Sequence, residues 1–287
     1  MQISAAVQKQ VLRDLAPLWM KSASVDAFDR IDDAPTDYWP IIIRDNIDAR
    51  GVQGAHWTRD GQPFALVQAG ADIDFVCVRV SHEALEMLID PYGNMVIAGA
   101  SPQDPSDRVN FVVEVCDPVQ GPHNGYSVNG LLVSDFVTPA YFGPISAPSG
   151  RYSYSGRVTD HHQVLESGYL SWIDPLEDRL WQAENVGGQL TVYDRGRYEP
   201  DQPMRMQSDL HMWNHRSDRE SPSLTLTSPR IGQRAREAFV SRANGIQRQI
   251  AQILEKSEHP NQGSRKERRK RTRKPPLVQT SPAKQLR

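Results

Sequence analysis

His82, Glu83 and Glu86 have the residue types and the spacing that a metal site requires. On a helix, residues four positions apart share one face at about 6 Å, so His82 and Glu86 can hold one divalent cation. Glu83 lies about 100° further round such a helix, close enough to act as general base on a water molecule at the cation. Zinc hydrolases use this division of labour. Because a carboxylate stands in place of a second imidazole, Ca²⁺ and Mn²⁺ are alternatives to Zn²⁺.

The best candidates for the remaining ligands are Glu114 and Asp117. Alternating valines predict a strand at 109–115, with Glu114 on the polar face. Asp117 has the opposite parity, so both carboxylates reach one cation only if the chain bends at Cys116, which the following Pro118 favours. The alternative is that Glu114 is no ligand itself: it orients the imidazole of His82 by a hydrogen bond to it, or it lies at a solvent-exposed edge of the sheet.

Several other residues are weaker candidates for ligands. His56 lies in the glycine-rich segment 51–63, which is expected to be a loop, and a surface-loop histidine is the alternative. Asp90 would project toward the motif if the helix continued, but Asp-Pro more often ends a helix. The pairs His161–His162 and His211/His215 are more easily explained as surface residues.

Hydrophobic periodicity predicts the elements that position these residues. Apolar spacing predicts a helix over 2–20 that ends at Pro17. Ser81 is a suitable N-cap for the helix that carries the motif, and residues 90–94 favour turns and end it. Asn129-Gly130 predicts a two-residue hairpin turn between strands at 126–128 and 131–133. Further short strands are expected at 39–43, 64–67, 73–80, 169–173 and 189–193, and a loop at 51–63.

These elements predict an α+β fold in which one central helix that carries the motif packs on a mainly antiparallel sheet. We expect a metal-binding domain over residues 1–200 and a C-terminal extension over 201–256, which contains an amphipathic helix at 229–256. Residues 257–287 contain too few apolar residues to form a core and are expected to be a disordered basic tail.

Five segments, in this order along the chain, resemble the successive blocks of a family of largely uncharacterised bacterial and phage proteins, a family that is similar to zincin metallopeptidases. A looser likeness (HExxE, then Asp-Pro, then Glu-x-x-Asp) extends to plant phosphate-induced proteins of the exordium type. The resemblance implies a zincin-like fold over about residues 6–142, with Glu86 where the HExxH motif of zincins has its second histidine. The matching segments are residues 13–19, 54–64, 81–91, 114–117 and 133–142.

Two functions from different classes follow from this pattern. The first is a zinc-dependent peptidase in which Glu83 is the general base and a protein or peptide substrate lies along an edge strand. The second is a non-catalytic scaffold or interaction protein, such as a virion component, in which a metal only fixes the fold. The replacement of the usual second histidine by Glu86 favours the second somewhat.

Charge is unevenly distributed along the chain. Residues 264–287 hold ten of the 33 Lys and Arg and one of the 35 acidic residues, so the preceding 263 residues have a net charge of −11. Eight of the ten residues at 265–274 are basic, which suits weak, salt-dependent contact with nucleic acid or a solvated tail.

Composition sets further limits. No segment approaches the roughly 20 apolar residues of a membrane helix, and the charged N-terminal segment is unlike a signal peptide. We therefore expect a cytoplasmic or virion-associated protein. The two cysteines, Cys77 and Cys116, allow one disulfide but equally suit buried free thiols.

Overall fold

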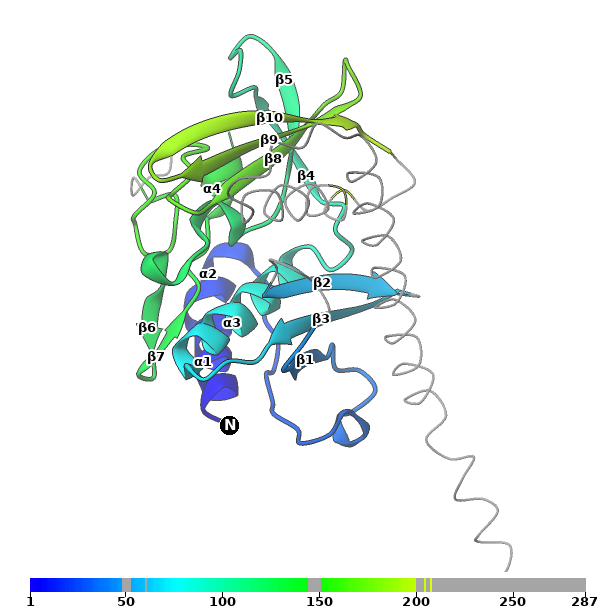
Figure 1. The fold of residues 1–287 in the computed structure, drawn as a ribbon, viewed down its shortest axis with the longest axis vertical. Coiled ribbons are helices and arrows are strands. Elements are labelled where there is room, and N and C mark those ends of the chain that lie inside the picture. Colours follow the sequence, from blue (N-terminus) through cyan, green and yellow to red (C-terminus); the bar gives the residue numbers. More distant parts are fainter. Residues whose placement is uncertain (48–52, 60, 144–150, 200–203, 205–206, 208–287) are drawn as a thin grey trace, which may run out of the picture.

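The computed structural model describes residues 1–47, 53–59, 61–143, 151–199, 204 and 207. Within them the fold is α+β, with mostly antiparallel sheets and few helices, as the sequence predicts at this level. Figure 1 shows a five-stranded sheet at one end of the molecule and the principal helices beside a three-stranded sheet in the other half. The predicted helix at 229–256, the basic tail and the His211/His215 pair lie outside the described residues.

The predicted N-terminal helix is confirmed. It consists of α1 (Gln2–Gln10), a π-helical stretch η1 (Val11–Leu15) and α2 (Ala16–Trp19). Pro17 does not end it, because the helix continues to Trp19, and Met20 follows in the left-handed conformation with φ 55°. A proline is tolerated in the first turn of an α-helix, where its missing N–H has no partner within the helix, and Pro17 is the second residue of α2.

The three-stranded sheet has the order β1-β3-β2. Its strands are β1 (Ile41–Arg44), β2 (Gly54–Arg59) and β3 (Gln62–Gln68); β1 is parallel to β3, and β2 is antiparallel to it. The predicted loop at 51–63 is therefore wrong over β2. Cross-strand packing, such as the stacking of Trp57 on Phe64, outweighs the glycines that flank this strand.

The five-stranded sheet has the order β10-β9-β8-β5-β4, and all neighbouring strands are antiparallel. The predicted strand at 189–193 is part of β10, while β9 was not predicted. Its inward-facing Gln182 and Glu184 break the apolar pattern, and the structure satisfies them by contacts with the buried Arg195. The strands are β4 (Val96–Ala100), β5 (Arg108–Val112), β8 (Tyr169–Asp174), β9 (Arg179–Val186) and β10 (Gln189–Arg197).

The predicted hairpin forms β6 (Tyr126–Val128) and β7 (Leu131–Val133). Both turn residues have positive φ, 52° at Asn129 and 82° at Gly130, as a two-residue hairpin turn requires. Two short helical segments precede the hairpin along the chain, η3 (Asp117–Val119) and η4 (Pro122–Asn124), and α4 (Pro139–Phe142) follows it. A further 3-10 turn, η2 (Ile31–Asp33), precedes β1.

Helix α3 (Ile73–Ile89) corrects two expectations. The strand predicted at 73–80 is wrong, because these residues form the first half of α3. Ser81 is not an N-cap but lies in mid-helix, and the cap is Asp72, whose side chain accepts a hydrogen bond from the N–H of Asp74 at 2.9 Å. Burial on several sides lets valines occupy this helix despite their preference for strands, since packing outweighs local propensity.

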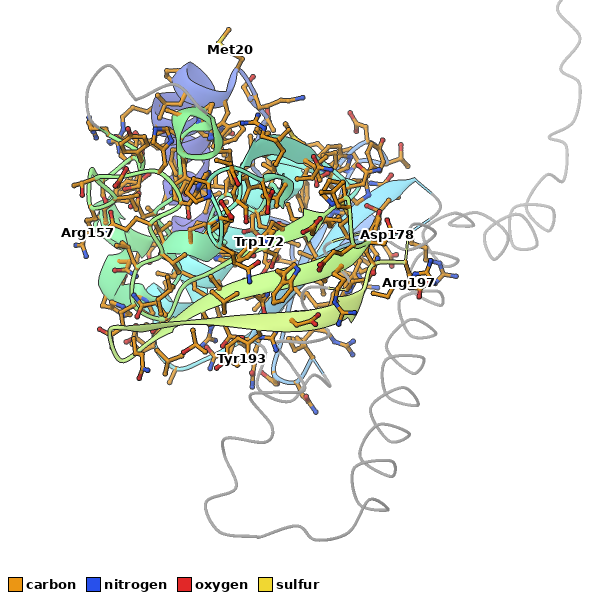
Figure 2. All side chains as sticks on the ribbon, turned by 90° about the horizontal axis from the view of Figure 1, so that it is seen from above. Met20, Arg157, Trp172, Asp178, Tyr193 and Arg197 are labelled. Atoms are coloured by element: carbon orange, nitrogen blue, oxygen red, sulfur yellow. The ribbon has the colours of Figure 1, made fainter. Side chains whose placement is uncertain are left out.

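The main core lies between α1, α3 and the five-stranded sheet and includes Val80, Leu85, Phe111 and Trp172. In Figure 2, Trp172 lies within the mass of side chains, whereas Met20 and Arg157 lie at its periphery. Among the described residues, no helix is both long enough and apolar enough to cross a membrane. The core therefore places the C-terminal half of α3 deep in the molecule.

Candidate metal centre

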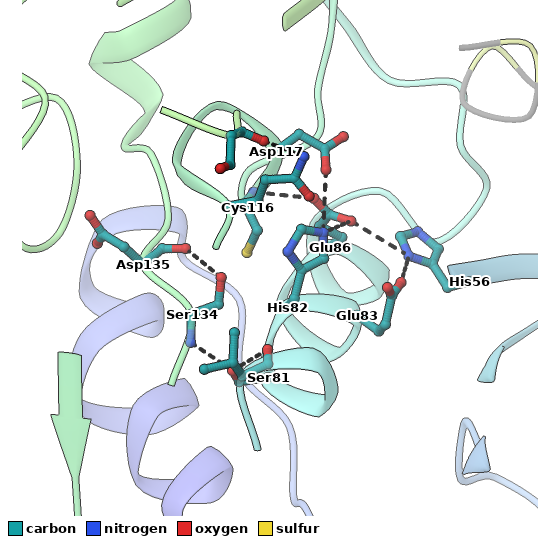
Figure 3. Close-up of polar contacts among 12 residues, drawn as sticks. His56, Ser81, His82, Glu83, Glu86, Cys116, Asp117, Ser134 and Asp135 are labelled. Atoms are coloured by element: carbon teal, nitrogen blue, oxygen red, sulfur yellow. Dashed lines mark hydrogen bonds and ion pairs between the residues drawn. The ribbon is translucent and has the colours of Figure 1, made fainter. Parts of the chain in front are cut away.

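Helix α3 places three potential donors on one side of its C-terminal half. With about 100° per residue, Glu86 lies angularly between His82 and Glu83. Figure 3 shows Glu86 at the centre of the cluster, with His56 and Glu83 on one side and Asp117 and Cys116 on the other. The Glu83 and Glu86 side chains are buried, and the His82 side chain is 14% exposed.

The first group of potential metal ligands surrounds the imidazole of His82. Its Nε2 lies 3.2 Å from Oε2 of Glu86 and 3.3 Å from Oδ1 of Asp117. Donor atoms of Glu86, Glu114 and Asp117 all lie within 4.8 Å of one another. His82, Glu86, Glu114 and Asp117, which the sequence singled out as ligands, are therefore brought together.

The bend required at Cys116 is present. Strand β5 ends at Val112, and Cys116 adopts a helical conformation (φ −100°, ψ −22°) before the 3-10 turn of η3. The turn redirects Asp117 so that it no longer follows the alternation of the strand. Glu114 and Asp117 thus face the same helix despite their opposite parity.

A second group of donors involves His56, which β2 carries toward α3. Nδ1 of His56 lies 3.0 Å from Oε2 of Glu83 and 3.8 Å from Oε2 of Glu86. All three side chains are buried, and their donor atoms lie within 4.8 Å of one another. The sequence predicts a loop here, which makes His56 only a weak candidate; in the structure His56 belongs to a strand and its side chain is buried.

Cys116 was not predicted to belong to the site. Its backbone N–H donates to Oε1 of Glu86 at 3.2 Å, and its thiol lies within reach of His82 and Glu86 as a third possible group. Both Cys77 and Cys116 are free and buried, so the disulfide alternative is excluded. Position 116 therefore orients Glu86, a candidate ligand, through its main chain.

The electrostatics of the cluster favour retention of protons. Burial by itself would lower the pKa of His82, but the charge of Glu86 and hydrogen bonds to Asp117 and Glu86 raise it well above its ordinary value. Burial and the charge of Glu86 raise the pKa of Asp117 to about 6, against the opposing effect of His82. Burial also raises the pKa of the Cys116 thiol. Carboxylates crowded in a buried space shift each other in this way.

Three side chains of α3 accept main-chain N–H groups from the segments that surround the site. Oδ1 of Asp74 accepts from Leu132 at 2.8 Å, and Oγ of Ser81 accepts from Ser134 at 2.8 Å. The third contact is the one from Cys116 to Glu86 described above. The helix and the chain that returns along it are thus joined at both ends and in the middle.

Other candidates from the sequence lie elsewhere. Oδ2 of Asp90 accepts from the N–H of Met95 at 2.7 Å and belongs to the turn that ends α3. His162 packs on Phe111 with ring centroids 4.0 Å apart, and burial lowers its pKa to about 4. Neither His161 nor His162 belongs to a group of metal-binding type within the part of the chain that the structure describes.

In comparisons with protein-family models, with curated proteins and with solved structures, no match to this chain is found. Geometry alone therefore identifies the candidate site: the described residues contain three groups of side chains that could hold a metal ion, and Glu86 belongs to all three.

Proposed function

We propose that the chain is a metal-dependent hydrolase of the peptidase type, with Zn²⁺ as its ion. The observation that carries the proposal is the convergence of His82, Glu86 and Asp117 from two segments far apart in sequence, with Nε2 of His82 3.2 Å from Glu86 and 3.3 Å from Asp117. Metal–ligand bonds of 2.0–2.2 Å in a tetrahedral site separate the ligands by about 3.4 Å. Glu114 would supply a further ligand or hold one in place.

Zn²⁺ supplies Lewis acidity: it lowers the pKa of a water molecule and polarises a carbonyl group. Glu83 is the general base in this proposal, because it lies on the same helix face next to Glu86. His56, whose Nδ1 lies 3.0 Å from the carboxylate of Glu83, fixes the orientation of that carboxylate. The arrangement agrees with the resemblance of the motif to the HExxH helix of zincins, with Glu86 as the second ligand.

A peptide substrate would bind along β2. This strand lies at the edge of the three-stranded sheet and carries His56 next to Glu83. Extended peptides commonly add to an edge strand through main-chain hydrogen bonds, which would bring the scissile carbonyl alongside α3.

The proposal is tested by elemental analysis of protein purified without added metal, followed by an assay of casein cleavage. We expect about one Zn²⁺ per chain, and we expect Glu83→Gln to keep the ion but to lose at least about 100-fold in kcat, since general-base catalysis contributes 10²–10⁴-fold. Glu177→Gln, an exposed position, is the matched control. Wild-type protein that contains zinc yet cleaves nothing would remove the catalytic part of the proposal.

Gly54→Ala tests the placement of Glu83 without changing its chemistry. A Cβ at position 54 would lie 2.7 Å from Oε1 of Glu83, so the carboxylate must move while the backbone need not. We expect kcat to fall by about 100-fold, because a displacement of about 1 Å can cost this much, with the zinc content unchanged. Gly70→Ala is the control, since its Cβ would meet only ordinary contacts at 3.7 and 3.8 Å. Equal activity of the two variants would contradict the role of Glu83.

A non-catalytic scaffold with a structural metal is the second candidate, and burial of the cluster favours it. Of the three proposed ligands His82, Glu86 and Asp117, only His82 has an appreciably exposed side chain. A catalytic site, by contrast, keeps an open position for water and substrate. Metal removal would then lower the melting temperature without affecting any cleavage, and Glu83→Gln would change stability alone.

A further inference from the structure

We propose that the centre holds two divalent cations, the second bound by His56, Glu83 and the Glu86 oxygen that it shares with the first. The proposal rests on the metal centre proposed above and concerns how many ions it takes. In it, Glu86 is a bridging ligand, and Glu83 changes from a base to a ligand when the second ion binds.

Helix geometry places the two positions on opposite sides of Glu86. His82 lies about 40° to one side of it and Glu83 about 60° to the other. His56 approaches from β2 on the side of Glu83, whereas Asp117 approaches from η3 on the side of His82, as Figure 3 shows. The Glu86 carboxylate thus faces two separate sets of potential metal ligands.

The distances within the second set also suit a small cation. Nδ1 of His56 lies 3.0 Å from the nearer oxygen of Glu83 and 3.8 Å from that of Glu86. These values bracket the separation of about 3.4 Å expected for ligands in a tetrahedral zinc site. The same oxygen of Glu86, Oε2, also faces His82 at 3.2 Å.

The two oxygens of Glu86 have different partners, which specifies the kind of bridge. Oε1 accepts the main-chain N–H of Cys116, so Oε2 is the oxygen that faces both positions. A bridge through one oxygen brings two ions close together, and paired catalytic ions lie about 3.5–4 Å apart. The main-chain contact at Cys116 thereby sets the bridging geometry.

Charge supports two ions rather than one. Four carboxylates (Glu83, Glu86, Glu114 and Asp117) surround two imidazoles, and all four are buried. Imidazoles that bind metal are neutral, so the four ionised carboxylates would place a charge of −4 in this buried space, which two divalent cations balance and one does not.

The second ion binds more weakly than the first. Its protein ligands are two side chains and a shared oxygen, whereas the first position also has Asp117 and Glu114 nearby. Loss of even an outer partner costs 10–100-fold in metal affinity, so we expect a difference on the order of tenfold or more. Because Glu83 becomes a ligand, binding of the second ion withdraws it from proton transfer, and excess metal would inhibit hydrolysis.

The test is titration of the full-length, metal-free protein with Zn²⁺ by calorimetry and with Mn²⁺ by electron paramagnetic resonance. Wild type is expected to bind two ions, and the Mn²⁺ pair to show exchange coupling, which two distant ions would lack. His56→Gln and, independently, Glu83→Gln should each bind a single, uncoupled ion, with unchanged circular dichroism. His123→Gln, which removes an exposed imidazole outside the cluster, should still bind the coupled pair.

Each other outcome is decisive. A single ion in wild type overturns the second position and leaves the proposed function standing, whereas no bound ion removes both. Two ions without coupling, or a second ion that persists in both His56→Gln and Glu83→Gln, would place that ion elsewhere on the chain and overturn the proposal. Because the coupling is measured in wild type, the proposal remains testable even if one variant fails to fold.

Discussion

Replacement of Glu86 by Gln is expected to lower the affinity for Zn²⁺ by more than about 100-fold. This side chain belongs to every group of potential ligands in the described residues, and even loss of an outer partner of a ligand costs 10–100-fold. Isothermal titration of the metal-free protein measures the effect. Glu177→Gln, at an exposed position, should bind metal as wild type does.

The same substitution distinguishes a ligand from a structural residue. The amide introduced by Glu86→Gln keeps an oxygen that can accept the N–H of Cys116, and the change removes one of several crowded negative charges. We therefore expect the melting temperature of the metal-free variant to equal or exceed that of wild type, while the stabilisation by added Zn²⁺ disappears. A variant that melts well below metal-free wild type, yet still binds Zn²⁺ tightly, would show that Glu86 holds the fold and not an ion.

The free energy of unfolding of the metal-free protein is expected to fall as the pH rises from about 4 to 8. The pKa of Asp117 is raised from 3.8 to about 6 in the folded protein, so the folded state binds its proton more tightly than the unfolded state does. The free energy of unfolding therefore falls between pH 3.8 and about pH 6, by about 3 kcal/mol for a pKa raised by about two. The raised pKa of His82 acts in the same direction, since its favourable contribution is lost as the pH rises through its folded value.

Zn²⁺ should reverse the sign of this dependence. Ligands must lose their protons to bind metal, so stabilisation by the ion grows with pH, and about 3 to 4 kcal/mol is expected at 100 to 1,000 times the dissociation constant. Denaturant unfolding at pH 4.5, 6 and 7.5, with chelator and with Zn²⁺, measures both slopes. Asp117→Asn should flatten the metal-free slope. A metal-free wild type that gains stability over this range would contradict the raised pKa of Asp117.

The motif residues could be predicted from the sequence because local spacing determines their positions. His82 and Glu86 lie one turn apart on α3 whichever residue begins that helix, so the error over 73–80 did not affect their relation. The start of α3 at Ile73 is not predicted from the sequence, because the valines at 76, 78 and 80 favour a strand locally. Only the packing of α3 on both sides, which the local sequence does not reveal, makes a helix of them.

The contributions of His56 and Cys116 could not be predicted in the same way. Whether His56 points inward depends on the pairing of β2 with β3, a contact between segments whose register the sequence leaves open. Cys116 acts through its backbone N–H, which every residue except proline has. The signal that located Asp117, by contrast, was the expected irregularity before Pro118, and that irregularity is present as η3.

The three main-chain contacts that Asp74, Ser81 and Glu86 accept along α3 affect which ions can bind. They join α3 to residues 116, 132 and 134 before any ion arrives, unlike small zinc domains that fold only around their metal. We expect such a scaffold to discriminate by the number and type of ligands that it can bring to one ion. Ca²⁺ takes six to eight oxygens, more than this scaffold brings to one position beside an imidazole nitrogen, whereas a four-coordinate ion such as Zn²⁺ would require little rearrangement.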